Sequence, residues 1–271
     1  MDADVRMLTL DTGLTVPYVT HGSADGTAIV LLHGWAESMG VFDRLIPLLP
    51  ERFHTIAFDL RGHGGATKPH SGYSLEEVAT DVRAFLDAVG VASAVLLGSS
   101  SGGYIAQQVA VSNPDRVAAL VLVGAPRSLA GRPPFAGDVD ALTDPVDAGW
   151  VRASLDWFRL HTPVPAEYLA ERVRDGVRMP AHAWRLSLDG LTSARPPSLA
   201  RRIPLPALII RGAHDDVISL EEHERLASAI PGSRLISYDD TGHLVLWEQP
   251  DRIASDVTAF LDGLVPRPRK K

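Results

Sequence analysis

The stretch Leu97-Gly98-Ser99-Ser100-Ser101-Gly102-Gly103 decides how the rest of the chain is interpreted. It follows the apolar run Ala94–Leu97, which is typical of a buried strand, and it precedes a helical pattern over Tyr104–Ala110. Between strand and helix it carries the pattern G-x-S-x-G. This combination predicts a nucleophile elbow, a strained turn that exposes a serine hydroxyl above a sheet.

The spacing of the glycines selects one serine of the three. Ser100 has Gly98 two residues before it and Gly102 two residues after it. Ser99 would need glycine where Leu97 stands, and Ser101 would need it at Ser99. So sharp a turn brings these flanking positions against the backbone, where a side chain would clash. A glycine- and serine-rich turn without chemistry remains the alternative when this motif is taken alone.

Length and composition limit the remaining possibilities. At 271 residues the chain is long enough for one large domain or for a core domain with an insertion. The net charge of -7, with both signs mixed along the chain, disfavours a nucleic-acid partner. The absence of cysteine excludes disulfides, thiolate metal sites and a cysteine nucleophile.

The chain ends suggest no targeting or membrane segment. Acidic residues stand in Met1–Arg6 where a signal peptide would be basic, and no apolar run is long enough to cross a membrane. The short basic tail 266–271 is expected to be frayed. We therefore expect a cytoplasmic protein with no membrane partner.

Strand and helix patterns alternate in the first half of the chain. A hairpin is expected from Met7–Leu10 and Leu14–Thr20, and a helix is expected over Met39–Leu49. Ser74 and Glu77 form a capping-box pattern at the start of another helix, which runs to about Gly90. Further strands are expected at Ala28–Leu32, Phe53–Phe58, Ala94–Leu97 and Val117–Val123. This alternation predicts a parallel, doubly wound α/β sheet.

The alternation stops after Pro126 and resumes near residue 206. Residues 127–202 contain several prolines and no convincing strand. Helices are expected at Val151–His161, Ala166–Gly176 and Ala181–Leu191. The sequence thus predicts a core domain formed by residues 1–126 and 203–271, with a helical insertion over 127–202. The core then continues with strands at Pro206–Arg211 and Arg234–Tyr238 and helices near Leu220–Ile230 and Pro250–Leu264.

A serine nucleophile needs a histidine to take its proton and an acid to orient that histidine. In open α/β sheets such groups lie beyond the carboxyl ends of the strands. Asp215 and His243 follow the last two expected strands, and the chain order Ser100, Asp215, His243 differs from that of chymotrypsin-like and subtilisin-like proteases. Asp216 is the competing acid, but the Gly-x-x-Asp spacing from Gly212 favours Asp215.

With these residues the chain resembles the serine-nucleophile branch of the α/β-hydrolase superfamily, which includes esterases, lactonases and haloperoxidases. The matching motifs are the elbow, His33-Gly34-Trp35, Asp59-Leu60-Arg61-Gly62-His63-Gly64, Gly212–Asp215, and Gly242-His243 followed by Glu248-Gln249-Pro250. The resemblance implies a three-layer α/β sandwich with residues 127–202 as a lid. It also implies an oxyanion hole formed by the backbone N–H groups of Trp35 and Ser101.

Two departures narrow the expected chemistry. Epoxide hydrolases and haloalkane dehalogenases of this superfamily carry an aspartate at the elbow, where this chain has Ser100. The H-G-x-P motif of epoxide hydrolases is also missing, because Ala36 follows Trp35. Both activities are therefore disfavoured.

The other histidines and the insertion carry weaker signals. The resemblance implies structural roles for His33 and His63, and no pair of histidines has the spacing of a helical zinc site, so we expect no metal and no cofactor. Large side chains of the insertion are expected mostly in its own core, with three candidates for the substrate pocket: Trp157, Phe158 and Trp184. An arginine of the insertion could bind a substrate carboxylate, among them Arg152, Arg159, Arg178 and Arg185.

We therefore expect a serine hydrolase that cleaves a small or medium carboxylic ester or lactone through an acyl-enzyme. The same three residues would also serve carbon–carbon bond hydrolysis, peracid formation as in cofactor-free haloperoxidases, or the removal of N-terminal proline. A non-catalytic receptor for a small molecule is an alternative of a different class. The protein is expected to be a monomer or homodimer whose partner is a small acyl substrate.

Overall fold

The computed structural model describes residues 4–200 and 203–264, so the tail beyond Leu264 and the last two residues of the predicted insertion lie outside the described residues. Eight strands in these ranges form one sheet in the order β1-β2-β4-β3-β5-β6-β7-β8. Their bounds are β1 Arg6–Thr9, β2 Thr15–Gly22, β3 Thr27–Leu32, β4 Phe53–Phe58, β5 Ala94–Ser99, β6 Val117–Val123, β7 Ala207–Gly212 and β8 Arg234–Tyr238. Strands β3 to β8 pair in parallel, whereas β2 is antiparallel to both β1 and β4.

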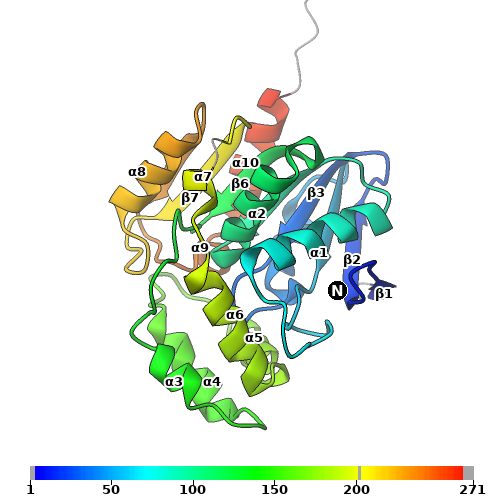
Figure 1. The fold of residues 1–271 in the computed structure, drawn as a ribbon. Helices are drawn as coiled ribbons and strands as arrows, with labels where there is room; N and C mark the ends of the chain where they lie inside the picture. The colour runs from blue at the N-terminus through cyan, green and yellow to red at the C-terminus, as the bar shows by residue number, and fades with distance from the viewer. Residues whose placement is uncertain (1–3, 201–202, 265–271) are drawn as a thin grey trace, which may run out of the picture.

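Helices cover both faces of this sheet, which makes the three layers (Figure 1). One face packs against α1 (Leu75–Ala88), α2 (Ser101–Ser112) and α8 (Leu220–Ala229). The other packs against α10 (Pro250–Leu264), α9 (Val245–Glu248) and the 3₁₀ turns η1 (Met39–Phe42) and η2 (Ile46–Leu48). Strands β5 and β7 are buried along their whole length, because both faces are covered. A third 3₁₀ turn, η3 (Pro114–Arg116), leads into β6.

A helical segment connects β6 to β7, and the described part of it contains no strand. It comprises α3 (Ala136–Asp140), α4 (Ala148–Ser154), the 3₁₀ turn η4 (Leu155–Trp157), α5 (Ala166–Arg178), α6 (Ala181–Ser193) and α7 (Pro197–Ala200). Helices α3 to α6 group together at one end of the sheet, while α7 lies near α2 and α8 (Figure 1). The segment has an apolar core of its own around Val151, Met179 and Trp184.

Two expected helices differ from the structure. The helix expected over Met39–Leu49 is replaced by the two short 3₁₀ turns, since Gly40 and Pro47 both disfavour a continuous α-helix. The helix expected at Val151–His161 is also wrong. The observed helix α4 begins at Ala148, and Asp147 caps it by accepting a hydrogen bond from the Trp150 N–H. The chain becomes extended at Phe158.

The capping box at the start of α1 is confirmed. The Ser74 hydroxyl accepts from the Glu77 N–H, and the Glu77 carboxylate accepts from the Ser74 N–H. Among the helices in the described ranges, none is long and apolar enough to span a lipid bilayer.

Candidate active site

Ser100 occupies the turn between β5 and α2 with a backbone φ of +49°, a value that side-chain-bearing residues rarely adopt. A Cβ atom on Gly98 would lie 2.4 Å from the backbone of Gly102, and a Cβ on Gly102 would lie 2.1 Å from the carbonyl oxygen of Leu32. Both positions therefore require glycine. The Ser100 N–H donates to the Val123 carbonyl over 2.8 Å, which fixes the turn to the neighbouring strand.

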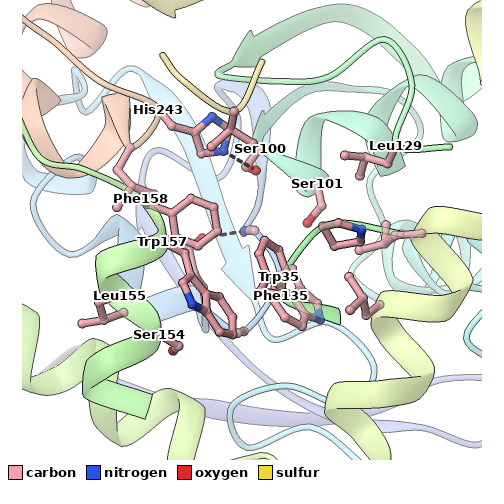
Figure 2. Close-up of a pocket in the computed structure, with 18 of the residues that line it drawn as sticks. Trp35, Ser100, Ser101, Leu129, Phe135, Ser154, Leu155, Trp157, Phe158 and His243 are labelled. Atoms are coloured by element: carbon pink, nitrogen blue, oxygen red, sulfur yellow. Dashed lines mark hydrogen bonds between the residues drawn. The ribbon is translucent and has the colours of Figure 1, made fainter. Parts of the chain in front are cut away.

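The structure brings Ser100, His243 and Asp215 into one hydrogen-bonded chain. The Ser100 Oγ lies 3.0 Å from His243 Nε2, and His243 Nδ1 lies 3.0 Å from Asp215 Oδ2. Figure 2 shows the contact between serine and histidine at the top of a pocket. Asp216, the competing acid in the sequence, is exposed to solvent, whereas Asp215 is buried.

The environment of Asp215 keeps its carboxylate ionised. Burial alone would raise the pKa of this carboxyl, but the charge and hydrogen bond of His243 and the N–H groups of Val217 and Ile218 hold the pKa below its ordinary value. Those two N–H groups donate to Asp215 Oδ1 over 2.9 and 2.8 Å. An ionised acceptor beside His243 Nδ1 holds the proton on that nitrogen, so Nε2 is free to accept from the serine hydroxyl.

A second strained turn lies beside the elbow. In the turn Gly34–Glu37, Ala36 has a φ of +64°, and Ala36 and Ser100 are the two non-glycine residues with positive φ in the described part of the chain. His33 Nδ1 donates to the Gly34 carbonyl over 2.8 Å, and His33 Nε2 accepts from the Leu60 N–H over 3.0 Å. These hydrogen bonds hold the turn against the strain.

Trp35 and Ser101 both lie on the wall of the pocket next to Ser100. Ser101 is the first residue of α2, where unpaired N–H groups and the helix dipole favour negative charge. Both residues therefore border the same cavity as the Ser100 hydroxyl. The Trp35 indole is engaged elsewhere, because its Nε1 donates to Ser187 Oγ over 3.0 Å.

Glu37 joins this turn to the histidine loop. Its Oε2 accepts from the Gly34 N–H over 2.6 Å, and its Oε1 accepts from Trp247 Nε1 over 2.7 Å. Trp247 belongs to α9, which begins two residues after His243. Burial raises the pKa of the Glu37 carboxyl, although both hydrogen bonds and the charge of Arg172 oppose the shift. Glu37 was not predicted as a site residue, because the sequence around it does not indicate that this acid is buried.

Glu248 makes a comparable connection on the other side of His243. Its Oε1 accepts from the Gly242 N–H over 2.9 Å, and its Oε2 accepts from the N–H groups of His161 and Thr162 over 2.8 and 2.6 Å. A single buried carboxylate thus ties the helical segment to the residue before His243. Glu248 belongs to the motif Glu248-Gln249-Pro250, but its hydrogen-bond donors could not be identified from the sequence.

The pocket has a volume of about 170 Å³, enough for on the order of ten water-sized groups. Aromatic rings line it. Phe135 stacks on Trp157 with ring centres 4.3 Å apart and on Trp35 with centres 5.8 Å apart. Phe158 lies over the His243 ring at 5.5 Å (Figure 2). An apolar wall so close to the histidine keeps water away from it.

The three pocket candidates predicted from the sequence, Trp157, Phe158 and Trp184, all line this cavity. Trp184 is only 2% exposed and its Nε1 donates to the Gly176 carbonyl, so it belongs mainly to the core of the helical segment. Phe135 was missed, because a lone phenylalanine after two prolines gives no periodic signal.

The arginines named from the sequence do not line the cavity. Arg152, Arg159 and Arg178 are exposed, and Arg185 is partly buried away from the pocket wall. Arg172 of α5 lies on the wall instead, buried, with its Nε 3.0 Å from Asp175 Oδ2.

Three of the remaining histidines are buried: His33, His63 and His223. Burial lowers the pKa of His33 to about 4 and that of His63 to about 3, so both are neutral near pH 7. His214 is exposed and stacks on His161, with ring centres 4.6 Å apart. Within residues 4–200 and 203–264, no group of three histidine, aspartate or glutamate side chains is placed to hold a metal ion.

Three features match a known family: the order of the strands, the elbow at Ser100, and the loops after β7 and β8 that carry Asp215 and His243. The model of the alpha/beta hydrolase fold family matches residues 27–250. The chain belongs to this family.

Named relatives within the family cover almost the whole chain. A non-heme chloroperoxidase of Streptomyces lividans is 28% identical and aligns with 94% of this chain and 98% of its own. The 3-oxoadipate enol-lactonase 2 of Acinetobacter baylyi is 25% identical, with 90% and 92% covered. The crystal structure of a hydrolase from Pseudomonas aeruginosa superimposes with a TM-score of 0.84 at 26% identity, covering 96% of this chain and 99% of that one.

Proposed function

We propose that the protein is a serine hydrolase that cleaves a small or medium carboxylic ester or lactone through an acyl-enzyme intermediate. The observation that carries this proposal is the chain of two 3.0 Å contacts from Ser100 through His243 to Asp215. The names of the relatives support it, since one is an enol-lactonase and a superimposed structure is a hydrolase.

In the first half of the reaction, Ser100 Oγ attacks the acyl carbonyl while His243 Nε2 takes the serine proton. Asp215 stabilises the imidazolium that forms. The carbonyl oxygen gains negative charge, and we assign its two donors to the N–H groups of Trp35 and Ser101. Donors of this kind contribute about 3–4 kcal/mol each to transition-state stabilisation in other hydrolases.

In the second half, the tetrahedral intermediate expels the alcohol, which receives its proton from His243. The acyl group stays on Ser100. A water molecule then gives a proton to His243 Nε2 and attacks the acyl carbonyl, and the free acid leaves as Ser100 regains its proton. The reaction needs no cofactor.

We also propose that the helical segment, residues 127–202 as expected from the sequence, acts as a cap over the site. Trp157 and Phe158 of this segment line the cavity beside His243. The backbone of this segment at His161 and Thr162 donates to Glu248, which also accepts from Gly242, the residue before His243. A cap in this position would shield the acyl-enzyme from bulk water.

The test is intact-mass spectrometry after incubation with a fluorophosphonate. The unmodified protein should gain one adduct, and Ser100→Ala should gain none, because the probe reacts with an activated serine. A folded protein that stays unlabelled would contradict the hydrolase proposal and favour a receptor. Matching circular dichroism spectra of the two proteins would exclude a folding defect in the variant.

A second candidate is peracid formation, favoured by the relative named as a chloroperoxidase. Here hydrogen peroxide replaces water in the second half and attacks the same acyl-enzyme, releasing a peracid. Acetate and hydrogen peroxide should then yield peracetic acid, detected by bromide oxidation. Ser100→Ala should abolish it.

A further inference from the structure

We propose that the cavity selects esters with an uncharged, apolar acyl group and discriminates against acyl groups that end in a carboxylate. This inference rests on the proposed function, because it concerns the group that stays on Ser100 in the acyl-enzyme. It goes further in naming the class of acyl group, which neither the family nor the catalytic residues determine.

The first observation is the composition of the wall around Ser100. The side chains that bound the cavity are mostly aromatic or aliphatic, and they come from both the core and the helical segment: Trp35, Leu129, Phe135, Val151, Trp157 and Phe158. An acyl group attached to Ser100 Oγ would lie against these surfaces. Apolar acyl groups gain from this contact in proportion to the area they bury.

The second observation concerns the polar side chains on the same wall. Ser154 Oγ donates to the Val151 carbonyl over 2.7 Å, and Thr192 Oγ1 donates to the Leu188 carbonyl over 2.9 Å. Both oxygens of Glu37 already accept hydrogen bonds. The hydroxyl hydrogens of Ser154 and Thr192 are thus used within the protein, and the Glu37 carboxylate has no hydrogen to donate, so none of these three groups can donate to a carboxylate at the end of an acyl group.

The third observation is the charge on the wall. Among the described residues that line the cavity, Arg172 is the one cationic side chain, and it is only 4% exposed. Its Nε lies 3.0 Å from Asp175 Oδ2, and the carboxylate of Glu37 is close enough to interact with it. Two carboxylates therefore face one guanidinium, with the exposed Arg178 3.7 Å from the second Asp175 oxygen. Arg172 Nε and Nη1 donate no hydrogen bond within the described residues, but the carboxylates of Asp175 and Glu37 balance the charge of the guanidinium. An entering substrate carboxylate would therefore meet no net positive charge.

An anion transferred into such a cavity loses its hydration without meeting a net positive charge, which is among the largest penalties in protein interiors. A neutral group of the same shape does not incur this penalty. The geometry thus favours uncharged acyl groups through the absence of a net positive charge as well as through apolar contact.

The experiment compares dimethyl adipate with monomethyl adipate, which share the scissile methyl ester and differ in charge at the far end. Methanol release is measured at pH 7.5. We expect kcat/KM to be lower for the monoester by roughly 100-fold or more, beyond the twofold contributed by the second ester group of the diester. Equal or faster hydrolysis of the monoester would overturn the proposal.

A pair of variants tests whether the wall causes the selectivity. Leu129 is half-buried and lines the same cavity as Ser101 (Figure 2). Leu129→Lys should reduce the ratio between the two esters about tenfold by adding a counter-charge. Leu129→Gln, of similar length but uncharged, should leave the ratio unchanged. An equal change in both variants would contradict a charge effect.

Binding separates this inference from the proposed function. Saturation-transfer NMR on Ser100→Ala should detect dimethyl adipate and give at most a weak signal for monomethyl adipate. If the unmodified protein neither hydrolyses the esters nor reacts with a fluorophosphonate, the hydrolase proposal fails, and this comparison alone decides the selectivity. Equal signals from both esters would overturn the inference whatever the catalytic result.

Discussion

Replacing Glu37 by glutamine should lower both stability and turnover, although the two side chains have nearly the same shape. Each carboxylate oxygen accepts one hydrogen bond, from the Gly34 N–H at 2.6 Å and from Trp247 Nε1 at 2.7 Å. A glutamine has only one acceptor oxygen. Its NH₂ group must therefore face one of these two N–H donors, and the turn at Gly34 or the indole must move away.

The magnitude follows from the contacts that are lost. A hydrogen bond to a charged group contributes about 1.5–3 kcal/mol, and Arg172 also loses part of its compensating charge, so the free energy of unfolding should fall by about 2–3 kcal/mol. If the Gly34 turn shifts, the neighbouring Trp35 N–H, which we propose as an oxyanion donor, should move with it. Because a full donor contributes about 3–4 kcal/mol, a partial loss corresponds to a decrease in kcat of roughly 10–100-fold.

The assay is hydrolysis of p-nitrophenyl butyrate, with unfolding in urea measured on the same samples. We expect kcat to fall while KM changes by less than about threefold, because the interaction strengthens in the transition state. Asp81→Asn is the matched control. Asp81 is a buried acid whose two oxygens accept from Arg61 over 2.7 and 2.8 Å, and it does not line the cavity. It should lose similar stability and keep kcat within about twofold.

Two results would refute this reasoning. If Glu37→Gln retained both its stability and its kcat, the hydrogen bonds of the carboxylate would be unimportant to the turn. If Asp81→Asn lost kcat to the same extent, the effect of Glu37→Gln would be a general consequence of destabilisation. Hydrogen exchange at the Gly34 N–H adds a direct readout, since protection there should decrease in Glu37→Gln alone.

Two further predictions concern stability. Burial lowers the pKa of His33 to about 4 and that of His63 to about 3, whereas a histidine in the unfolded chain takes up a proton below its ordinary pKa of about 6.5. Each histidine should therefore lower the free energy of unfolding by about 2.5 kcal/mol between pH 7.5 and 4.5. In urea titrations at these two pH values, His63→Gln should lose less stability than the unmodified protein. An identical pH dependence in the variant would show that His63 is not responsible. Gly102→Ala would place a Cβ 2.1 Å from the Leu32 carbonyl oxygen, and should cost more than about 3 kcal/mol or abolish soluble expression, so an unchanged melting temperature would contradict the close approach of β3 to the elbow.

The strands and the elbow could be predicted because their signals are local. Strand β4 was predicted at its observed bounds, and the capping box of α1 required only Ser74 and Glu77. The approach of Ser100, Asp215 and His243 could be predicted as well, since parallel strands place the loops at their carboxyl ends on the same edge of the sheet. The rule applies even though Ser100, Asp215 and His243 are far apart in the sequence.

The missed features depend on tertiary contacts. The periodicity of Met39–Leu49 predicts a helix, yet Gly40 and Pro47 break it into 3₁₀ pieces packed on the sheet. Glu37 accepts from Trp247, which lies 210 residues further along the chain. Local patterns carry no information about such a pair, so the buried acid could be found only in the structure.

Backbone strain and buried charge meet at the same place in this fold. Ala36 and Ser100 hold positive φ angles on the two turns that flank the reacting carbonyl in the proposed mechanism, and each such residue costs about 1–3 kcal/mol. Strain of this size persists only when surrounding contacts prevent relaxation. At the Ala36 turn those contacts are the hydrogen bonds of His33 and Glu37, and Glu37 is itself joined to the helix that follows His243. The buried carboxylate therefore links the turn of the proposed oxyanion donor to the helix that follows the proposed base, so a change that relaxes this turn should also displace His243.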